Sequence, residues 1–292
     1  MRWQRGHQSN DVIDRRGQRQ PLGVGGMGGL VGLLPLLLRS RFGWVIVLVI
    51  LGVGAFGGLG GLFGGASDRG VPEGAAAAKS NDEKAQLVGF VLDDAQQTWR
   101  DELARQGATY PTAKLVLFTD ATSTACGFGR AATGPFYCPA DERVYIDLGF
   151  YDELERRFGA QGDFAQAYVI AHEIGHHVQN VLGISDRVHQ AAATERAGAE
   201  GQSVRLELQA DCFAGLWANR TRERDLLEAG DVDEALGAAA AIGDDRIQKR
   251  STGRVHPESW THGSAEQRSR WFRIGFERGS FEGCDTFAVG VL

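Results

Sequence analysis

The pattern of hydrophobic and polar positions separates one long apolar stretch from the rest of the chain. Residues 42–65 carry no charge, and the segment Trp44–Leu51 is apolar at every position. At 1.5 Å per residue, 24 residues can cross a hydrocarbon core of about 30 Å, in which a helix satisfies its own backbone hydrogen bonds. The pattern therefore predicts a transmembrane helix over residues 42–65, with a buried core helix as the alternative.

Beyond that stretch, hydrophobic residues recur at helical spacing over most of the chain. The predicted helices cover residues 82–105, 164–182, 204–219 and 264–278. Runs rich in Val, Leu, Ile and Tyr at Ala113–Thr119 and Arg143–Leu148 predict two short strands. The expected fold class is therefore α+β, a mainly helical domain with a small β-sheet, preceded by one transmembrane helix.

These patterns divide the chain into four regions. Residues 1–41 are basic and Gly-rich, and we expect them to be a disordered segment. Residues 42–65 are the expected anchor, and residues 66–80, which are rich in Gly and Ala, are the expected linker. Residues 81–292 are enough for one folded domain.

The distribution of basic residues predicts the orientation of the anchor. Seven arginines precede Phe42, whereas Arg69 and Lys79 are the basic residues of the 66–80 segment. The positive-inside rule then places the N-terminus in the cytoplasm and the domain outside it, in the periplasm or the extracellular space. A two-span hairpin that also uses residues 21–38 would return the domain to the cytoplasm, which its cysteines argue against.

Net charge and cysteine content narrow the class of protein. A net charge of −6 and a pI near 5.7 argue against a nucleic-acid partner, because phosphate binding needs a basic face. The four cysteines all lie in the predicted domain and form no C-x-x-C motif, so a cysteine zinc site has little support. Their even number favours disulfides in an oxidising compartment, and four free thiols in a cytosolic enzyme are the alternative.

Three pairings of the cysteines are possible, and position favours one of them. Cys126 and Cys138 flank a Gly- and Pro-rich loop that has little core of its own. Cys212 lies in the predicted helix 204–219, and Cys284 follows the last predicted helix. We therefore expect Cys126–Cys138 and Cys212–Cys284, the second of which would tie the C-terminal tail to that helix.

The chemistry of the chain centres on the sequence His172-Glu173-Ile174-Gly175-His176, which matches H-E-x-x-H. Residues i and i+4 lie on one helix face, so both imidazoles can reach one Zn²⁺. Glu173 is then held beside the metal, where it can accept a proton from water. The motif falls inside the predicted helix 164–182, with Asp163 as the expected N-cap.

The motif needs a third ligand, and Glu207 is favoured. A metzincin would carry Gly and His where this chain has Gln179 and Leu182, so that class is excluded. Glu207 would complete a His₂Glu site, and Asp211, one turn later, can accept the N–H of a ligating histidine. A solvated charge on an amphipathic helix is the alternative for Glu207, and three residues remain rival ligands: His189, Glu195 and Glu200.

Two further features bear on catalysis. His262 lies in the polar turn before the predicted helix 264–278 and is the candidate donor to an oxyanion, with a surface or capping histidine as the alternative. The predicted strand at 143–148 precedes the zinc helix, and we expect it to bind an extended peptide by strand addition.

The combination of segments resembles the bacterial membrane-anchored neutral zinc metallopeptidase family of HExxH zincins. The resemblance rests on His172–Gln179 together with Glu207–Ala214. It is supported by Met1–Trp3, Asp14–Gly17, Ala125–Gly127, Phe136–Pro139, Arg254–Pro257, Thr261–Gly263 and Gly283–Phe287. It spans nearly the whole chain and implies a zincin-type fold.

The predicted function is a zinc metallopeptidase, anchored by a single pass in the bacterial cell membrane, that hydrolyses peptide bonds in a peptide or protein substrate. Zn²⁺ is the expected cofactor, with Glu173 as general base. Two other classes stay open: a zinc-stabilised, non-catalytic binding module of the cell envelope, and a zinc amidase acting on non-protein amides. Glu173 argues against the first, since a structural site has no need of it.

Overall fold

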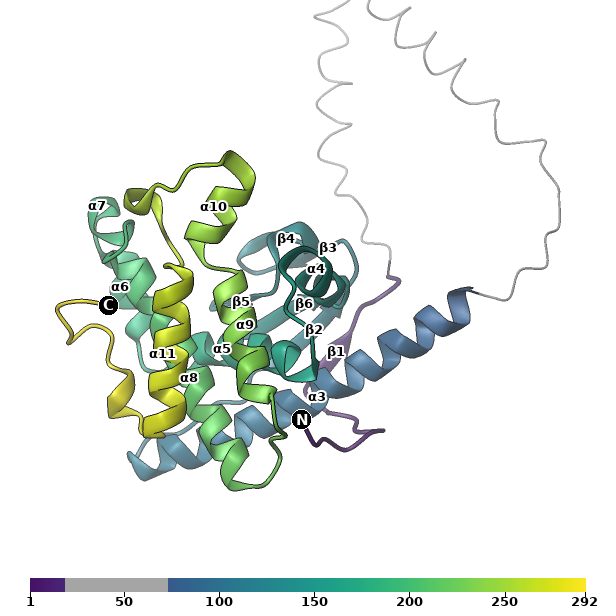
Figure 1. Ribbon diagram of the computed structural model, residues 1–292. Helices are drawn as coiled ribbons and strands as arrows, with labels where there is room; N and C mark the ends of the chain where they lie inside the picture. Colours follow the sequence, from purple (N-terminus) through teal and green to yellow (C-terminus); the bar gives the residue numbers. More distant parts are fainter. Residues whose placement is uncertain (19–72) are drawn as a thin grey trace, which may run out of the picture. The chain divides into compact units, whose positions relative to one another are not determined.

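The computed structural model describes residues 1–18 and 73–292 (Figure 1). Met1–Gln18 and Ala78–Leu292 belong to one folding unit. The expected transmembrane helix at 42–65 lies outside the described residues. Within the described ranges, no helix is both long and apolar enough to span a bilayer.

A four-stranded mixed sheet has the order β1 (Val12–Asp14), β2 (Lys114–Phe118), β6 (Arg143–Asp147) and β5 (Phe136–Cys138). The first three strands run parallel, and β5 is antiparallel to β6. Most of β2 is buried, as expected of parallel strands covered on both faces. A separate hairpin pairs β3 (Ala121–Thr124) with β4 (Gly127–Arg130). The sequence predicted β2 and β6, but it missed β1, β5 and the hairpin.

Helices make up most of the domain, as the fold-class prediction required. They are α3 (Glu73–Arg105), α4 (Gly149–Phe158), α5 (Asp163–Val181), α6 (Ile184–Gln190), α7 (Ala193–Arg196), α8 (Gln202–Glu223), α9 (Asp231–Ala241), α10 (Asp244–Thr252) and α11 (Ala265–Arg278). Short 3₁₀ turns among the described residues lie at Ala131–Thr133, Pro257–Ser259 and Glu282–Cys284. Because α3 begins at Glu73, part of the expected linker 66–80 is helical.

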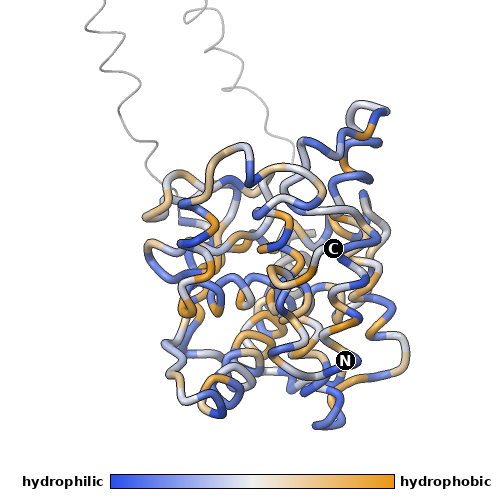
Figure 2. The backbone as a smooth tube through the Cα atoms, turned by 90° about the vertical axis from the view of Figure 1, so that its left-hand side faces the viewer, coloured by the Kyte–Doolittle hydropathy of each residue, from blue (hydrophilic) through white to orange (hydrophobic). Residues whose placement is uncertain are grey.

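Helix α8 is the centre of the core. Its Phe213 packs edge-on against Trp99 of α3 at 4.9 Å between ring centroids, and its Trp217 stacks on Phe164 of α5 at 5.4 Å. All four rings are fully buried. Helix α5 contacts the sheet as well as α8, so it lies between the two (Figure 1). Figure 2 shows hydrophobic stretches running through the inside of the folded part, while many of the outer turns are hydrophilic.

Glycines allow two pairs of helices to approach closely. A Cβ at Gly215 of α8 would overlap the carbonyl of Phe272 on α11, and one at Gly275 of α11 would overlap the carbonyl of Cys212. A Cβ at Gly175 of α5 would lie 3.1 Å from the backbone of Ala210 on α8. The glycine inside the H-E-x-x-H motif therefore brings α8 close to the two histidines.

Residues 1–18 are folded, which corrects the expectation that the 1–41 segment is disordered throughout. β1 pairs with β2, and the Met1 side chain lies in the main core. The N-terminal ammonium group binds Asp163 at 2.6 Å and Asp231 at 3.2 Å. These contacts join residues far apart in sequence, so local periodicity gives no sign of them.

The start of α5 also differs from the prediction. The N-cap is Gly162, which has no side chain to cap the helix. A carboxylate from another helix takes that part, because Glu234 of α9 accepts the Phe164 N–H at 3.1 Å. Asp163, the predicted cap, is the first helical residue and binds the N-terminal ammonium group instead. Both carboxylates lie at the positive end of the helix dipole of α5.

Candidate metal centre

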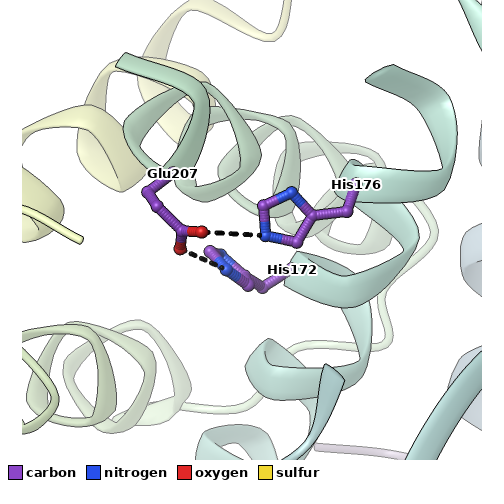
Figure 3. Close-up of side chains that lie close together, drawn as sticks. All are labelled: His172, His176 and Glu207. Carbon is purple, nitrogen blue, oxygen red and sulfur yellow. Dashed lines mark ion pairs between the residues drawn. The ribbon is translucent and has the colours of Figure 1, made fainter. Parts of the chain in front are cut away.

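Two histidines of α5 and one glutamate of α8 converge on a single point (Figure 3). The Nε2 atom of His172 lies 3.3 Å from one Glu207 carboxylate oxygen, and the Nε2 atom of His176 lies 3.5 Å from the other. One donor atom from each residue lies within 4.8 Å of the others. Two imidazole nitrogens and a carboxylate oxygen are a donor set that suits Zn²⁺.

Hydrogen bonds at the far side of each ring fix the orientation of both histidines. The Nδ1 atom of His172 lies 2.8 Å from Asp211 Oδ1, and the Nδ1 atom of His176 lies 2.8 Å from Gln179 Oε1. Since these acceptors require Nδ1 to carry a proton, both Nε2 atoms point towards Glu207, where a metal ion can take the place of a proton. Asp211 was predicted for this part, whereas Gln179 was missed.

Asp211 is itself held by two buried side chains. The guanidinium of Arg268, on α11, donates from Nε to Oδ2 and from Nη2 to Oδ1, both at 2.9 Å. The hydroxyl of Tyr168 donates to Oδ1 as well. Burial raises the pKa of Asp211, but the charges of Arg268 and His172 more than offset this, so its pKa lies below the ordinary value. Asp211 is therefore an ionised acceptor for His172.

The two carboxylates make the convergence point a strong site for a cation. Burial lowers the pKa of His172, but the Asp211 carboxylate outweighs it and the pKa rises to about 10. Burial likewise raises the pKa of Glu207, yet the neighbouring His176 and His172 hold it well below the ordinary value. Positive charge is favoured where these groups meet, whether it is carried by protons or by a metal ion.

Glu173 supplies an unpaired buried oxygen next to this donor set. Its side chain is buried, and its Oε2 atom has no hydrogen-bond partner among the residues that the structure describes. Burial raises its pKa, which the two motif histidines only partly offset. A buried carboxylate oxygen without a partner fits a site that takes up a water molecule beside a metal.

His262 reaches the same cleft from the turn before α11. Asp244 fixes this turn, because its Oδ2 atom accepts the backbone N–H groups of Thr261 and His262 at 2.8 and 2.7 Å. The His262 Nδ1 atom lies 3.3 Å from Asp244 Oδ1. The hydrogen bond to Asp244 and the negative charge of Glu207 raise the pKa of His262. The capping role considered for His262 belongs to Ser264, whose hydroxyl accepts the Gln267 N–H at 3.1 Å.

The rival third ligands do not join the donor set among the described residues. His189 lies on the cleft wall. Glu195 is exposed on α7. Glu200 instead accepts from Arg205 and from the Leu292 N–H. Glu207 alone of the four candidates meets the two motif histidines.

The donor set opens into a cleft of about 770 Å³. Its wall includes the catalytic candidates Glu173 and His262 and a group of apolar side chains: Phe136, Phe150, Val169, Leu206, Ile242 and Ile247. The Cys126–Cys138 disulfide ties the tip of the β3–β4 hairpin to β5 at this wall, with its Cα atoms 5.8 Å apart. The second disulfide, Cys212–Cys284, links α8 to the C-terminal tail. Both predicted pairings are confirmed.

The strand that faces the cleft is not the predicted one. β6, which covers most of the expected strand 143–148, pairs with β2 on one side and β5 on the other, so it has no free edge for a peptide. β5 is the edge of the sheet, and its Phe136 and Tyr137 line the cleft. The hydrophobic pattern gave no signal for β5, because this strand has three residues and lies inside a segment rich in Gly and Pro.

Comparisons with known proteins agree with this geometry. The model of a family described as "Putative neutral zinc metallopeptidase" matches residues 1–287. The protein YpfJ of Escherichia coli (strain K12) is 44% identical over 293 residues, which cover 100% of both chains. The protein Rv2575 of Mycobacterium tuberculosis (strain ATCC 25618 / H37Rv) is 46% identical over 194 residues, covering 63% of this chain and 65% of its own. No solved structure matches the chain.

Proposed function

This chain belongs to the neutral zinc metallopeptidase family, and from that premise we propose that it hydrolyses peptide bonds with Zn²⁺ as cofactor and Glu173 as general base. One observation carries the proposal. The unpaired Oε2 atom of Glu173 lies in the same cleft as the converging donors His172, His176 and Glu207. A zinc site that only stabilised a binding module would have no use for a buried, unpaired base.

In the proposed reaction, the metal and two residues of the cleft, Glu173 and His262, have separate roles. Bound Zn²⁺ would lower the pKa of a water molecule to about 7 and polarise the scissile carbonyl. Glu173 accepts a proton from the attacking water and delivers it to the leaving amine. His262, with its raised pKa, donates a hydrogen bond to the substrate oxygen as negative charge develops there.

The shape of the cleft favours an extended peptide as substrate over a small amide. β5 has an unpaired edge along the cleft wall, and an extended peptide can hydrogen-bond to such an edge through its main chain. The apolar side chains of the wall would then receive side chains of the peptide. Strand addition at β5 replaces the expectation for strand 143–148.

The decisive test is Glu173→Gln. We expect it to abolish peptide hydrolysis and leave about one zinc per chain, because Glu173 is a base and not a ligand. Activity is measured on a peptide library with and without chelator, and zinc by elemental analysis. Glu195→Gln, an exposed glutamate outside the donor set, is the matched control and should keep both activity and zinc. Loss of zinc in Glu173→Gln, or full activity without zinc, would refute the proposal.

We further propose that the chain is anchored in the bacterial membrane through its apolar residues 42–65. The docking of residues 1–18 on the domain changes the topology expected for this anchor. We therefore propose that residues 1–18 and 78–292 lie on the same side of the membrane, because β1 and β2 share a sheet. The single crossing expected from the basic residues would place these two strands on opposite sides.

A further inference from the structure

Arg268 is a buried cation next to the metal donors that is not itself a ligand. Its side chain is only 2% exposed, yet it lines the cleft together with His172 and Glu173. Its Nε and Nη2 atoms bind the two oxygens of Asp211, and Nη2 also lies 3.2 Å from the Tyr168 hydroxyl. Through Asp211, which accepts from His172, Arg268 helps to position a metal ligand.

The remaining nitrogen of Arg268 has no partner. A guanidinium has five N–H groups, and Nη1 carries two of them. In the part of the chain that the structure describes, Nη1 makes no hydrogen bond, whereas Nε and Nη2 are fully engaged. Within the described residues, Nη1 is not one of the fully buried unpaired atoms, so it is open to the cleft that Arg268 lines, where an acceptor of a bound molecule can reach its two N–H groups.

Charge decides which acceptor fits. Asp211 already neutralises Arg268 through two hydrogen bonds. A free carboxylate at the end of a peptide would therefore meet no unbalanced charge on this guanidinium, whereas a main-chain carbonyl needs none. Carbonyl oxygens are also good acceptors for an arginine N–H.

We propose that Nη1 of Arg268 binds a main-chain carbonyl oxygen of the peptide beside the scissile bond, so that the enzyme cleaves within chains and not at a free C-terminus. This inference rests on the proposed function. It gives Arg268 two roles, one towards Asp211 and one towards substrate. Only the second role predicts a change in peptide affinity at constant zinc content.

The test measures peptide binding in the catalytically inactive Glu173→Gln protein loaded with zinc, using a peptide that the wild-type enzyme cleaves internally. Arg268→Lys keeps the positive charge but has one terminal nitrogen, which cannot bind Asp211 and also replace the Nη1 donor. We expect peptide binding about tenfold weaker at unchanged zinc content. Arg273→Lys is the matched control: Arg273 is exposed on the same helix and does not line the cleft, so affinity should change by no more than about twofold.

Peptides in which one carbonyl at a time is replaced by a methylene group locate the contact. At one position next to the scissile bond, the loss of affinity should be absent in Arg268→Lys, because the contact is already gone. If Arg268→Lys does not fold, the ¹⁵N resonances of the Arg268 guanidinium in the Glu173→Gln protein give the same answer. They should shift with the full peptide and not with the peptide reduced at that position.

The outcomes separate the two proposals. Unchanged affinity in Arg268→Lys, or losses that add at every position, would overturn the role of Arg268 while the proposed function stands. So would an affinity that depends on a free C-terminal carboxylate in the wild type and not in Arg268→Lys. If the wild-type protein cleaves no peptide at all, the proposed function fails and this inference fails with it.

Discussion

At the scale of single residues, each of the two histidines of the metal centre has its own hydrogen-bond partner on the far side of the ring. Asp211 orients His172, and Gln179 orients His176. Gln179 is held in turn, since its amide donates to the Leu206 carbonyl at 2.7 Å and to Gln209 at 3.1 Å. Both supports run back to α8, the helix that carries Glu207. The third ligand and the orientation of the other two therefore depend on one helix.

The pKa of His262 gives a prediction at this scale. Its hydrogen bond to Asp244 and the charge of Glu207 raise this pKa, and a charged imidazole is the stronger donor to an oxyanion. The charged form is present below the raised pKa and is lost as the pH rises through it. We therefore expect kcat/KM to fall on the alkaline side. Asp244→Asn, which lowers the pKa of His262, should move that fall to lower pH.

His262→Gln should remove this alkaline fall and lower kcat by about 10²- to 10³-fold with zinc content unchanged. pH profiles of kcat/KM, measured with zinc present, make the comparison. Asp245→Asn is the control, because Asp245 supports the same turn through the Ala265 N–H and does not contact His262. A profile that stays in place in Asp244→Asn would mean that His262 is not the titrating donor.

The functional residues that belong to a local sequence motif were predictable, whereas those that contact the site from a distant part of the chain were not. The spacing of His172 and His176 and the Glu207–Asp211 pair one turn apart are visible along single helices. Arg268 is invisible at that level, because it lies 57 residues from Asp211 on another helix. An arginine in an amphipathic helix looks like a surface charge until the tertiary structure buries it.

At the scale of elements, the centre depends on how closely α5 and α8 approach each other. Gly175 faces the backbone of Ala210, and a Cβ there would lie 3.1 Å from it. Alanine favours a helix by about 1 kcal/mol over glycine, but the backbone of α8 cannot yield as a side chain can. We expect Gly175→Ala to destabilise the protein by about 1–3 kcal/mol and to weaken zinc binding, since α8 carries Glu207.

Gly237→Ala is the matched control, because Gly237 lies within α9 with no atom near its would-be Cβ. That variant should be neutral or more stable by up to about 1 kcal/mol. Denaturant unfolding and zinc competition with a chromophoric chelator measure both variants. If Gly175→Ala behaves like Gly237→Ala in the two assays, close packing of α5 on α8 does not hold the third ligand in place.

Elements with strong periodicity were predictable, and short strands were not. The helix that bears the motif and the strands β2 and β6 follow from composition and spacing alone. β1 and β5 are three residues long, and each is defined by its partner in the sheet. The prediction about peptide binding failed for the same reason, since an edge is a property of the sheet and not of a strand.

At the scale of the whole molecule, the fold gives the N-terminal arginines a role other than setting topology. Arg2, Arg5 and Arg16 form ion pairs on the folded unit, with Glu228, Glu83 and Asp14 respectively. Charges that belong to a folded domain carry little weight in the positive-inside rule, which counts short loops. Arg39 and Arg41 then carry the signal, and they lie between the apolar runs 21–38 and 42–65.

This arrangement leads to a prediction about topology. Two crossings with Arg39 and Arg41 on the cytoplasmic side would leave residues 1–18 and the domain together outside, where the disulfides are stable.

Single cysteines introduced by Gln8→Cys, Ser40→Cys and Glu195→Cys report on the three parts, since the native cysteines are all paired. Gln8 and Glu195 are both exposed. A membrane-impermeant maleimide applied to spheroplasts should label the Gln8 and Glu195 variants alike and spare the Ser40 variant. Labelling of the Ser40 variant alone would keep the two ends together but place the domain in the cytoplasm. Opposite labelling of the Gln8 and Glu195 variants would restore the single crossing, and β1 could then not belong to the sheet.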